Sequence, residues 1–432
     1  MNGVLIIFGV VVAGFFASVF FFPQIRLHKA TIETFWIFPI IGVIALLSFS
    51  FLTPQEIWQS LTANTSVNPL KILTLFFSMT IISVYLDEAG FFRYLAGRTA
   101  SKSKGSQKRF FYAMYVVISI LTIFTSNDII ILTFTPFLCY FCKNAKVSAI
   151  PYLIMEFVAA NTWSLFLIIG NPTNIYLATS FGFNFLEYTS IMALPTVTAG
   201  VVSLVIIRLL FNKQLNQTIT IGETKPVIED KFLKNISLVT LIVCVFALVV
   251  SSFFAEVEMW YIAFGLALLL IAIVLIYKLH KKETPRKMFY TFAHLPWLLI
   301  PFVIAMFIMV EALEKYGVTE MIASSLNNPT YEVFTYGFTS FLLANILNNI
   351  PMSVLFSSIA STKGAVLATV IASDIGALLT PVGALAGIMW TNIVKRNGVK
   401  MSMFKFVLYG VVIAVPTLAC SLGTLYGVLL FM

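Results

Sequence analysis

Long apolar stretches, separated by short polar segments, run through almost the whole chain. Each stretch has about 20 residues, which is the length that an α-helix needs to cross the hydrocarbon core of a bilayer. The pattern therefore predicts an all-α polytopic membrane protein with about ten transmembrane helices. The expected spans cover residues 2–22, 35–52, 69–86, 149–179, 186–211, 235–254, 259–277, 295–310, 364–394 and 404–431.

Two further apolar stretches are interrupted in the middle by polar residues. Residues 110–142 contain Asn127 near their centre, and residues 331–362 contain Asn349. Backbone that leaves a helix at membrane depth must line a cavity or lie buried in protein. We therefore expect each of these stretches to form a re-entrant hairpin.

Two of the expected spans also contain breaks. Residues 149–179 include the sequence GNPTN at 170–174, and residues 364–394 include TPVG at 380–383. Proline removes a backbone donor and interrupts a helix, while glycine and asparagine tolerate irregular backbone. Both spans are therefore expected to be broken helices.

The order of elements is the same in the two halves of the chain. Residues 1–211 and 235–432 each contain three spans, a hairpin, a broken span and a final span, and residues 212–234 form a polar linker. Five full crossings per half is an odd number, so the second half enters the membrane from the opposite side. This pattern predicts two inverted-topology repeats, which in secondary transporters build one substrate site near the bilayer midplane.

The charges predict the orientation. The chain is 59% hydrophobic and only 10% charged, and it has 27 Lys and Arg residues. All of them except Lys71, Lys315 and Lys363 fall in segments that this layout places on one side, the linker included. By the positive-inside rule that side is the cytoplasm, so both termini are expected outside the plasma membrane. The net charge of +9 then follows from orientation, and no nucleic-acid partner is expected.

Polar side chains gather at the hairpin tips and at the breaks. An unpaired polar group in hydrocarbon costs several kcal/mol, so such clusters favour a functional site. Freed N–H groups at broken helices face an anionic or hydroxylated ligand, while freed carbonyls and carboxylates hold a cation or proton. The alternative is that these groups only hydrogen-bond neighbouring helices, and for Thr162 and Ser164 both readings stay open. The candidate substrate- or ion-binding residues are Ser126, Asn127, Asp128, Asn161, Asn171, Thr173, Asn174, Asn345, Asn348, Asn349, Ser373, Asp374, Thr380 and Gly383.

Three carboxylates are expected deep in the membrane: Asp128, Glu156 and Asp374. An Asp in such a site could load and release a proton as the cavity alternates between wet and dry. Asp128 and Asp374 lie beside the breaks in positions that we take as corresponding, so we predict that they are the proton-coupling residues. Glu156 lies in a helix interior and could simply pair with an amide.

Other chemistry finds little support. The four cysteines lie in apolar segments, and Cys139 and Cys142 have no second pair to complete a zinc site, so we expect no disulfide framework, metal or cofactor. There is no GxxxxGK[ST] sequence, so ATP would require a separate subunit. The absence of HExxH and GxSxG motifs argues against an enzyme, which stays a remote alternative beside a channel.

At these residues the chain resembles the ion transporter superfamily, and within it the arsenite permease-like branch of arsenical pump membrane proteins. Residues 373–390, SDIGALLTPVGALAGIMW, resemble the Asp-x-Gly, Thr-Pro-x-Gly-x-x-Ala and Trp pattern of that branch. Asn348 and Asn349 are similar to its Asn-Asn-x-Pro, and Asn127 and Asp128 to its Asn-Asp hairpin.

The resemblance implies a scaffold domain and a mobile transport domain that carries the site across the membrane in an elevator mode. It also implies export of the neutral trihydroxide of arsenic or antimony against protons, alone or with an ATPase partner. The family often forms homodimers. Proton-coupled efflux of arsenite or antimonite is therefore the leading functional hypothesis.

Two other transport functions remain open. The GNPTN sequence at 170–174 looks closer to carboxylate-type and sodium/proton members of the superfamily, and Asn161 stands where an Asp is expected in arsenite permeases. These departures favour a sodium-coupled anion or dicarboxylate transporter, or a sodium/proton antiporter. The substrate is thus a small inorganic or organic ion, with a proton or sodium as the coupling ion.

Overall fold

The computed structural model describes residues 1–22, 24–27, 30–63, 68–103, 105–216, 227–254, 257–285, 289–326 and 331–432. Residues 217–226 of the expected linker lie outside the described residues. So do five of the cationic residues used for orientation, namely Lys29, Lys104, Lys225, Arg286 and Lys287.

The first half begins with helices that lie outside the predicted hairpin and break: α1 (Asn2–Phe21), α2 (Ile37–Ser48), α3 (Pro54–Thr62), α4 (Pro69–Glu88) and α5 (Phe91–Lys102). The predicted hairpin follows as two arms, α6 (Gln107–Phe124) and α7 (Asn127–Asn144). The broken helix consists of α8 (Ile150–Trp163), the 3-10 turn η1 (Ile168–Gly170) and α9 (Pro172–Phe181). The half ends with α10 (Phe185–Leu210) and the short α11 (Asn212–Leu215).

The second half has the same order of elements. It begins with α12 (Lys231–Ser251), α13 (Met259–His280), α15 (Tyr290–Ala293), α16 (Leu299–Lys315) and α17 (Val318–Leu326). The hairpin arms are α18 (Glu332–Leu347) and α19 (Asn349–Ser357). The broken helix is α20 (Lys363–Gly376), η2 (Pro381–Gly383) and α21 (Leu385–Arg396), and α22 (Met403–Leu430) ends the chain. A helix therefore ends at each expected hairpin tip and at each expected break, while the re-entrant form of the hairpins and the inverted orientation of the halves stay predictions.

Several spans differ in length from the prediction. Within the described residues, seven helices are long and apolar enough to cross a membrane. One of them is α6, which was expected only as a hairpin arm. The span expected at 35–52 is wrong in length, because α2 has 12 residues and is therefore about 18 Å long. The span expected at 295–310 begins and ends later, as α16.

A two-stranded antiparallel hairpin joins α1 to α2 and was not predicted. Strands β1 (Gln24–Leu27) and β2 (Ala30–Glu33) pair so that Gln24 lies opposite Glu33. Among the described residues, these are the two strands of the structure, so the helical fold class is confirmed.

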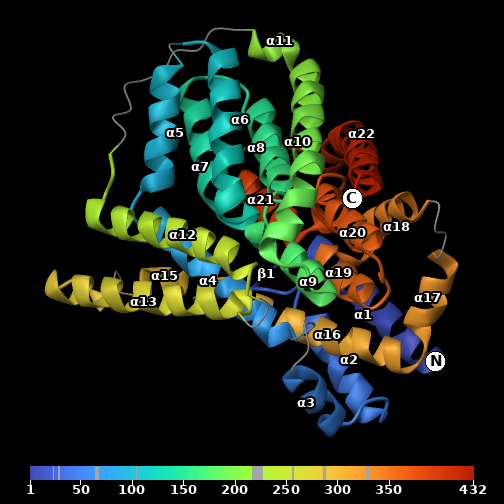
Figure 1. Cartoon of the computed structure of the whole chain (residues 1–432). Coiled ribbons are helices and arrows are strands. Elements are labelled where there is room, and N and C mark those ends of the chain that lie inside the picture. Colours follow the sequence, from blue (N-terminus) through green and yellow to red (C-terminus); the bar gives the residue numbers. More distant parts are fainter. Residues whose placement is uncertain are drawn as a thin grey trace.

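The helices form two groups. In the first, α12 and α13 lie side by side against α4, at the left of Figure 1, and α2 packs against α1 and α16. In the second, α8 packs against both arms of the first hairpin, and α10 packs along α22. The hairpins interlock across the halves, because α7 packs on α21 while α9 packs on α19. The two breaks are thereby brought to the centre of the second group.

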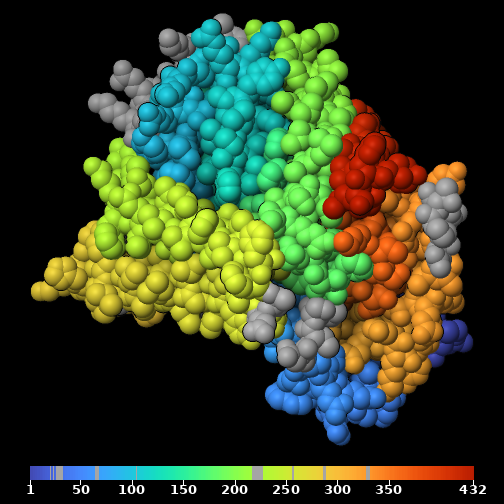
Figure 2. Space-filling view, viewed as in Figure 1, coloured from blue at the N-terminus to red at the C-terminus, as the bar shows by residue number. Residues whose placement is uncertain are grey.

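The surface of the first group is strongly apolar. Figure 2 shows α12 and α13 in yellow as a ridge on the left of the molecule. Large apolar side chains are exposed on them, among them Ile242, Phe246 and Ile276, the last two with 68% of their surface accessible. A continuous exposed apolar surface on helices of more than 20 residues is what lipid contact requires.

A buried ion pair ties the first group together at one end. The Lys278 ammonium on α13 contacts the Glu88 carboxylate on α4, and the Thr291 hydroxyl donates to the same carboxylate over 3.1 Å. The Lys278 side chain is only 2% exposed. Removing one partner of such a pair leaves the other charge buried without a counter-ion and with little hydration.

We predict that Lys278→Met destabilises the protein by about 3–5 kcal/mol, because it leaves the Glu88 carboxylate without its counter-ion. Thermal unfolding of the purified protein in detergent checks this. The matched control is Lys281→Met, because Lys281 pairs with Asp230 but is 45% exposed, so its loss should cost less than about 1 kcal/mol. Equal shifts in the two variants would contradict the prediction.

Candidate functional site

The two breaks have the same backbone form. Each 3-10 turn is preceded by an extended residue and is followed by another, Asn171 in the first half and Ala384 in the second. These two residues have φ and ψ of −148° and 144°, and of −150° and 155°, and each one precedes a new helix. Leaving the helix frees backbone N–H and C=O groups at membrane depth, where they need other partners.

A glycine ends each 3-10 turn because no side chain fits there. A Cβ atom on Gly383 would lie 2.7 Å from the Gly376 carbonyl oxygen and 2.8 Å from Asn345 Oδ1. A Cβ atom on Gly170 would meet the carbonyl of Ser164 in the same way. Each broken helix therefore folds closely back on its own preceding segment.

The Asp374 carboxylate lies where the two broken helices meet. Asp374 belongs to α20 and is completely buried, yet its hydrogen-bond donors all come from the first half. They are Asn171 Nδ2 at 2.6 Å, Ser164 Oγ at 2.8 Å, Asn174 Nδ2 at 3.4 Å and Thr173 Oγ1 at 3.5 Å. One carboxylate thus links the break of the first half to the helix before the break of the second.

These donors are all neutral. Within the described residues, neither Asp374 nor Asp128 forms an ion pair with a lysine or arginine. Placing a charged side chain at the bilayer centre costs about 2.5–3.5 kcal/mol on an insertion scale. At Asp374 that cost is offset by the hydrogen bonds and by the N-terminus of α9, whose dipole favours negative charge.

The tip of the first hairpin contacts the break of its own half. Ser126 caps α7 by accepting a hydrogen bond from Ile129 N over 3.4 Å. Asn127 donates from Nδ2 to Asn161 Oδ1 over 3.2 Å. Asp128 is half-buried, and among the described residues its carboxylate has no hydrogen-bond partner. It is therefore open to a proton, a cation or a substrate.

The tip of the second hairpin is a single residue. Asn348 has φ of 76° and ψ of 153°, a strained conformation that residues other than glycine rarely adopt, and its Nδ2 donates to the Val382 carbonyl over 2.8 Å. Asn345 donates to the Gly376 carbonyl over 3.1 Å and accepts from Thr380 Oγ1 over 2.7 Å. These amides satisfy backbone carbonyls that the break in the second half would leave exposed.

Several candidate groups are buried without a partner. Within the described residues these include the amide oxygens of Asn174 and Asn349 and the hydroxyl of Ser373. The hydroxyl of Ser353 on α19 is also buried without a partner among the described residues. Ser353 and Thr173 both line a cavity of about 20 Å³. A cavity of that size holds about one water molecule.

The structure groups the candidate residues into three clusters rather than one pocket. The first hairpin tip with Asn161, the second tip with Thr380, and the Asp374 cluster each have their own contacts. The expected correspondence of the two aspartates is wrong. Asp374 is the twelfth residue of α20, which matches Asn161 in α8, and Asp128 is the second residue of α7, which matches Ile350 in α19.

The role of Ser164 was left open by the sequence, and the partners of Glu156 were not predicted. Ser164, which the sequence leaves open between two roles, is a donor to Asp374. Glu156, for which pairing with an amide was one open interpretation, accepts from Thr135 and Trp390. No sequence signal identifies these partners, because each contact joins different elements.

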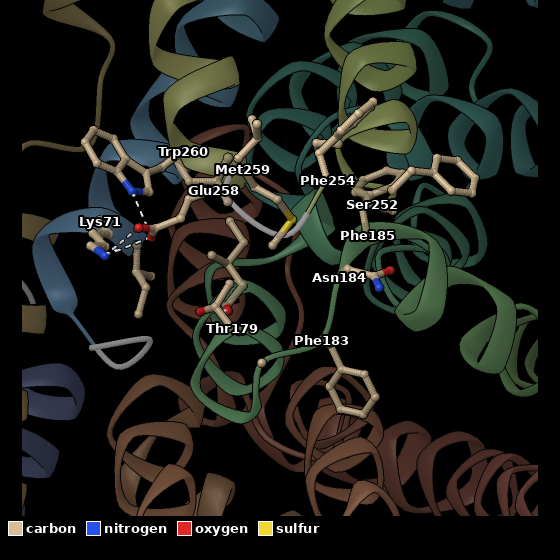
Figure 3. A pocket seen from close by; sticks show the side chains of 17 residues that line it. Lys71, Thr179, Phe183, Asn184, Phe185, Ser252, Phe254, Glu258, Met259 and Trp260 are labelled. Atoms are coloured by element: carbon tan, nitrogen blue, oxygen red, sulfur yellow. Dashed lines mark hydrogen bonds and ion pairs between the residues drawn. The ribbon is translucent and has the colours of Figure 1, made fainter. Parts of the chain in front are cut away.

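A larger cavity of about 600 Å³ lies away from these clusters, where α4, α9, α10, α12 and α13 meet (Figure 3). Lys71 and Glu258 form an ion pair of 2.8 Å on its wall, and Trp260 Nε1 donates to the same carboxylate over 3.1 Å. None of the candidate residues lines it. It lies between the two groups of helices, so a relative movement of the groups would change its shape.

Comparison with known proteins places the chain in a family. The model of the citrate transporter (CitMHS) family matches residues 34–364, which is most of the chain. The chain belongs to the citrate transporter family. The matched residues include both hairpins and the first break, and they end at the second residue of α20.

Several curated relatives of this family member are arsenical pump proteins. The arsenical pump membrane protein of Escherichia coli is 26% identical over 367 residues, which cover 81% of this chain and 84% of the relative. The putative arsenical pump membrane protein of Bacillus subtilis (strain 168) is 24% identical over 382 residues, which cover 80% and 85%. The predicted resemblance to the arsenite permease-like branch of the ion transporter superfamily is confirmed, and the homologues are transporters rather than enzymes.

A solved structure confirms the fold of this citrate transporter family member. The crystal structure of the Alcanivorax borkumensis YdaH transporter, reported to have an unusual topology, superposes with a TM-score of 0.55. The alignment covers 100% of this chain and 98% of that one, at 11% sequence identity. The chain is therefore a multi-pass membrane transporter of the arsenical pump and citrate transporter type.

We predict that the two aspartate substitutions affect the stability of this family member to different extents. Asp374→Asn replaces an acceptor oxygen by an NH₂ group that faces other donors, so it should cost about 1.5–3 kcal/mol. The Asp128 carboxylate has no hydrogen-bond partner among the described residues, so Asp128→Asn should change stability by less than about 0.5 kcal/mol. Melting temperatures in detergent test this, and a larger loss in the Asp128 variant would overturn the assignment.

Proposed function

We propose that this transporter exports arsenite or antimonite, as the neutral trihydroxide, in exchange for protons. The two hairpins and the two broken helices would provide alternating access to a site between them. The substrate, the coupling ion and the direction of transport go beyond membership of the family.

The observation that carries the proposal is the neutral chemistry of the candidate site. Its side chains are amides and hydroxyls, apart from Asp128 and Asp374, and among the described residues no lysine or arginine pairs with either carboxylate. A neutral ligand with three hydroxyl groups can donate and accept with such groups, whereas an anion gains most from a bidentate arginine. The names of the arsenical pump relatives support the same substrate.

Asp128 is the residue that we propose for coupling. Its carboxylate is half-buried, lies at the tip of a hairpin and accepts no hydrogen bond from the described residues. A group without fixed partners can take up and release a proton without breaking the fold. Asp374 has four donors, so we propose that its coupling role depends on breaking contacts between the two broken helices.

A sodium-coupled carrier of citrate or a similar anion is the second candidate function. The buried amide oxygens of Asn174 and Asn349 have no donors among the described residues, and such oxygens are suitable ligands for a hard cation. The name of the citrate transporter family supports a carboxylate substrate. Sodium/proton exchange, which needs no organic ligand, would use the same oxygens.

The remaining features of the proposal concern the whole assembly. We propose a plasma-membrane location with both termini outside, two inverted repeats, and an elevator movement of the second helix group against the first. The resemblance also implies two further partners. One is a second copy of the chain, in a homodimer formed through the first group of helices. The other is a separate ATPase subunit that drives efflux.

Uptake of trivalent arsenic into everted vesicles, with an imposed proton gradient and with or without sodium, tests the main proposal. We expect accumulation that depends on the proton gradient, does not require sodium, and disappears in Asp128→Asn. Inserted and folded protein that accumulates no arsenic would reject this substrate. A screen of citrate and dicarboxylates with a sodium gradient would then test the second candidate.

We predict that Asn349→Ala raises the half-saturation concentration for substrate, because it removes a buried amide oxygen that faces no protein donor. A loss of about 1–1.5 kcal/mol of binding energy corresponds to roughly a tenfold increase. Initial rates in the same vesicles measure it. Asn397→Ala, at an exposed amide after α21, is the control. An unchanged half-saturation in Asn349→Ala would remove this residue from the site.

A further inference from the structure

We infer that Glu156 is a further proton-carrying residue, which is reached from a lysine-lined cavity by way of Trp390. The inference rests on the proton coupling proposed above. It concerns a cluster of α7, α8 and α21 that lies apart from the candidate substrate residues.

The Glu156 carboxylate is completely buried and is held only by neutral donors. Thr135 on α7 donates to Oε1 over 3.0 Å, and the Trp390 indole on α21 donates to Oε2 over 3.0 Å. Within the described residues, no lysine, arginine or histidine forms an ion pair with Glu156. A carboxylate at membrane depth without a counter-ion is a functional candidate by default.

The helices around Glu156 carry charged residues, but among the described residues none of them pairs with its carboxylate. They are Lys108 and Arg109 on α6, Asp128 and Lys143 on α7, Glu187 and Arg208 on α10, and Lys363 and Asp374 on α20. Besides α7, the helices α6, α10 and α20 pack against α8. Cys139 on α7 is the titratable side chain in electrostatic contact with Glu156, and its thiol carries no charge in the neutral form. Among the described residues, no charged side chain of these helices is hydrogen-bonded to Glu156. A proton is therefore the partner that the cluster can accept in place of a cation.

Water can approach Glu156 through a cavity on the other side of Trp390. This cavity has a volume of about 770 Å³ and opens beside the segment that joins α21 to α22. Its wall includes Trp390, Pro381 and Phe406, and three lysines whose ammonium groups favour water: Lys395, Lys400 and Lys405. The lysine-rich segment is the one that the positive-inside rule places at the cytoplasm.

Trp390 separates the cavity from the carboxylate. Its indole is only 1% exposed and is packed between Phe157 and Phe406, with ring centroids 5.1 Å and 5.6 Å away. Trp390 lies on the helix that begins just after the second break, and Pro381 of that break lines the same cavity. A rearrangement at the break would turn the indole and let water reach the carboxylate.

The transfer itself is simple. An O–H bond of a hydronium ion in the cavity breaks, a new O–H bond forms on a Glu156 oxygen, and water and a neutral carboxyl group remain. The reverse step returns the proton to water. Thr135 and Trp390 are positioning residues, because they fix the carboxylate without exchanging the proton.

Infrared difference spectra of the reconstituted wild-type protein, recorded between two pH values, test the site directly. We expect a carbonyl stretch from a protonated, buried carboxyl group. This band should be lost in Glu156→Gln and retained in Glu187→Gln, a control at a half-buried carboxylate that is paired with Lys363. A spectrum of Glu156→Gln that matches the wild type would overturn the inference. Because no substrate is present, failure of arsenic transport leaves this test valid.

Transport variants provide the second test. Glu156→Gln should abolish proton-driven accumulation, Glu156→Asp should restore part of it, and Trp390→Phe should shift the pH profile while transport persists. A merely structural role would change protein yield and melting temperature without moving the pH profile. Wild-type accumulation and pH profile in folded Glu156→Gln would reject the inference.

Discussion

Four hydrogen bonds to the Asp374 carboxylate join the two halves at the point where each half leaves helical geometry. The donors lie at the first break, and the acceptor lies on the helix that leads into the second break. Backbone cannot be left unpaired in hydrocarbon, so each break depends on partners from outside its own helix. The amides of Asn345 and Asn348 provide such partners in the second half.

The interlocking of the hairpins follows from the same requirement. The arm α7 packs on α21 of the other half, and α19 packs on α9, so each break is covered by a hairpin arm that it does not follow in sequence. Moving one half alone would uncover both breaks. The hairpins and broken helices therefore pack as one unit, while α4, α12 and α13 pack against one another beside it (Figure 1).

The sequence was sufficient to place the breaks but not their partners. Proline, glycine and asparagine inside apolar stretches mark a departure from the helix, so the helix ends at both expected tips and both expected breaks lie where the sequence predicts them. The contacts of Asp374 with Asn171 and of Glu156 with Trp390 join residues that are more than 200 positions apart, and composition carries no information on such pairing. The match of Asp128 with Asp374 failed because it compared a hairpin with a broken helix. The strand pair at 24–33 was missed because each strand has only four residues.

The two hairpins differ in reach. The α7 arm has 18 residues and is about 27 Å long, whereas α19 has nine residues and is about 14 Å long. Neither arm is as long as the roughly 30 Å hydrocarbon core of a bilayer. The second arm is only about half as long as the first, so the repeated order of elements in the two halves does not make the two hairpins equal in depth.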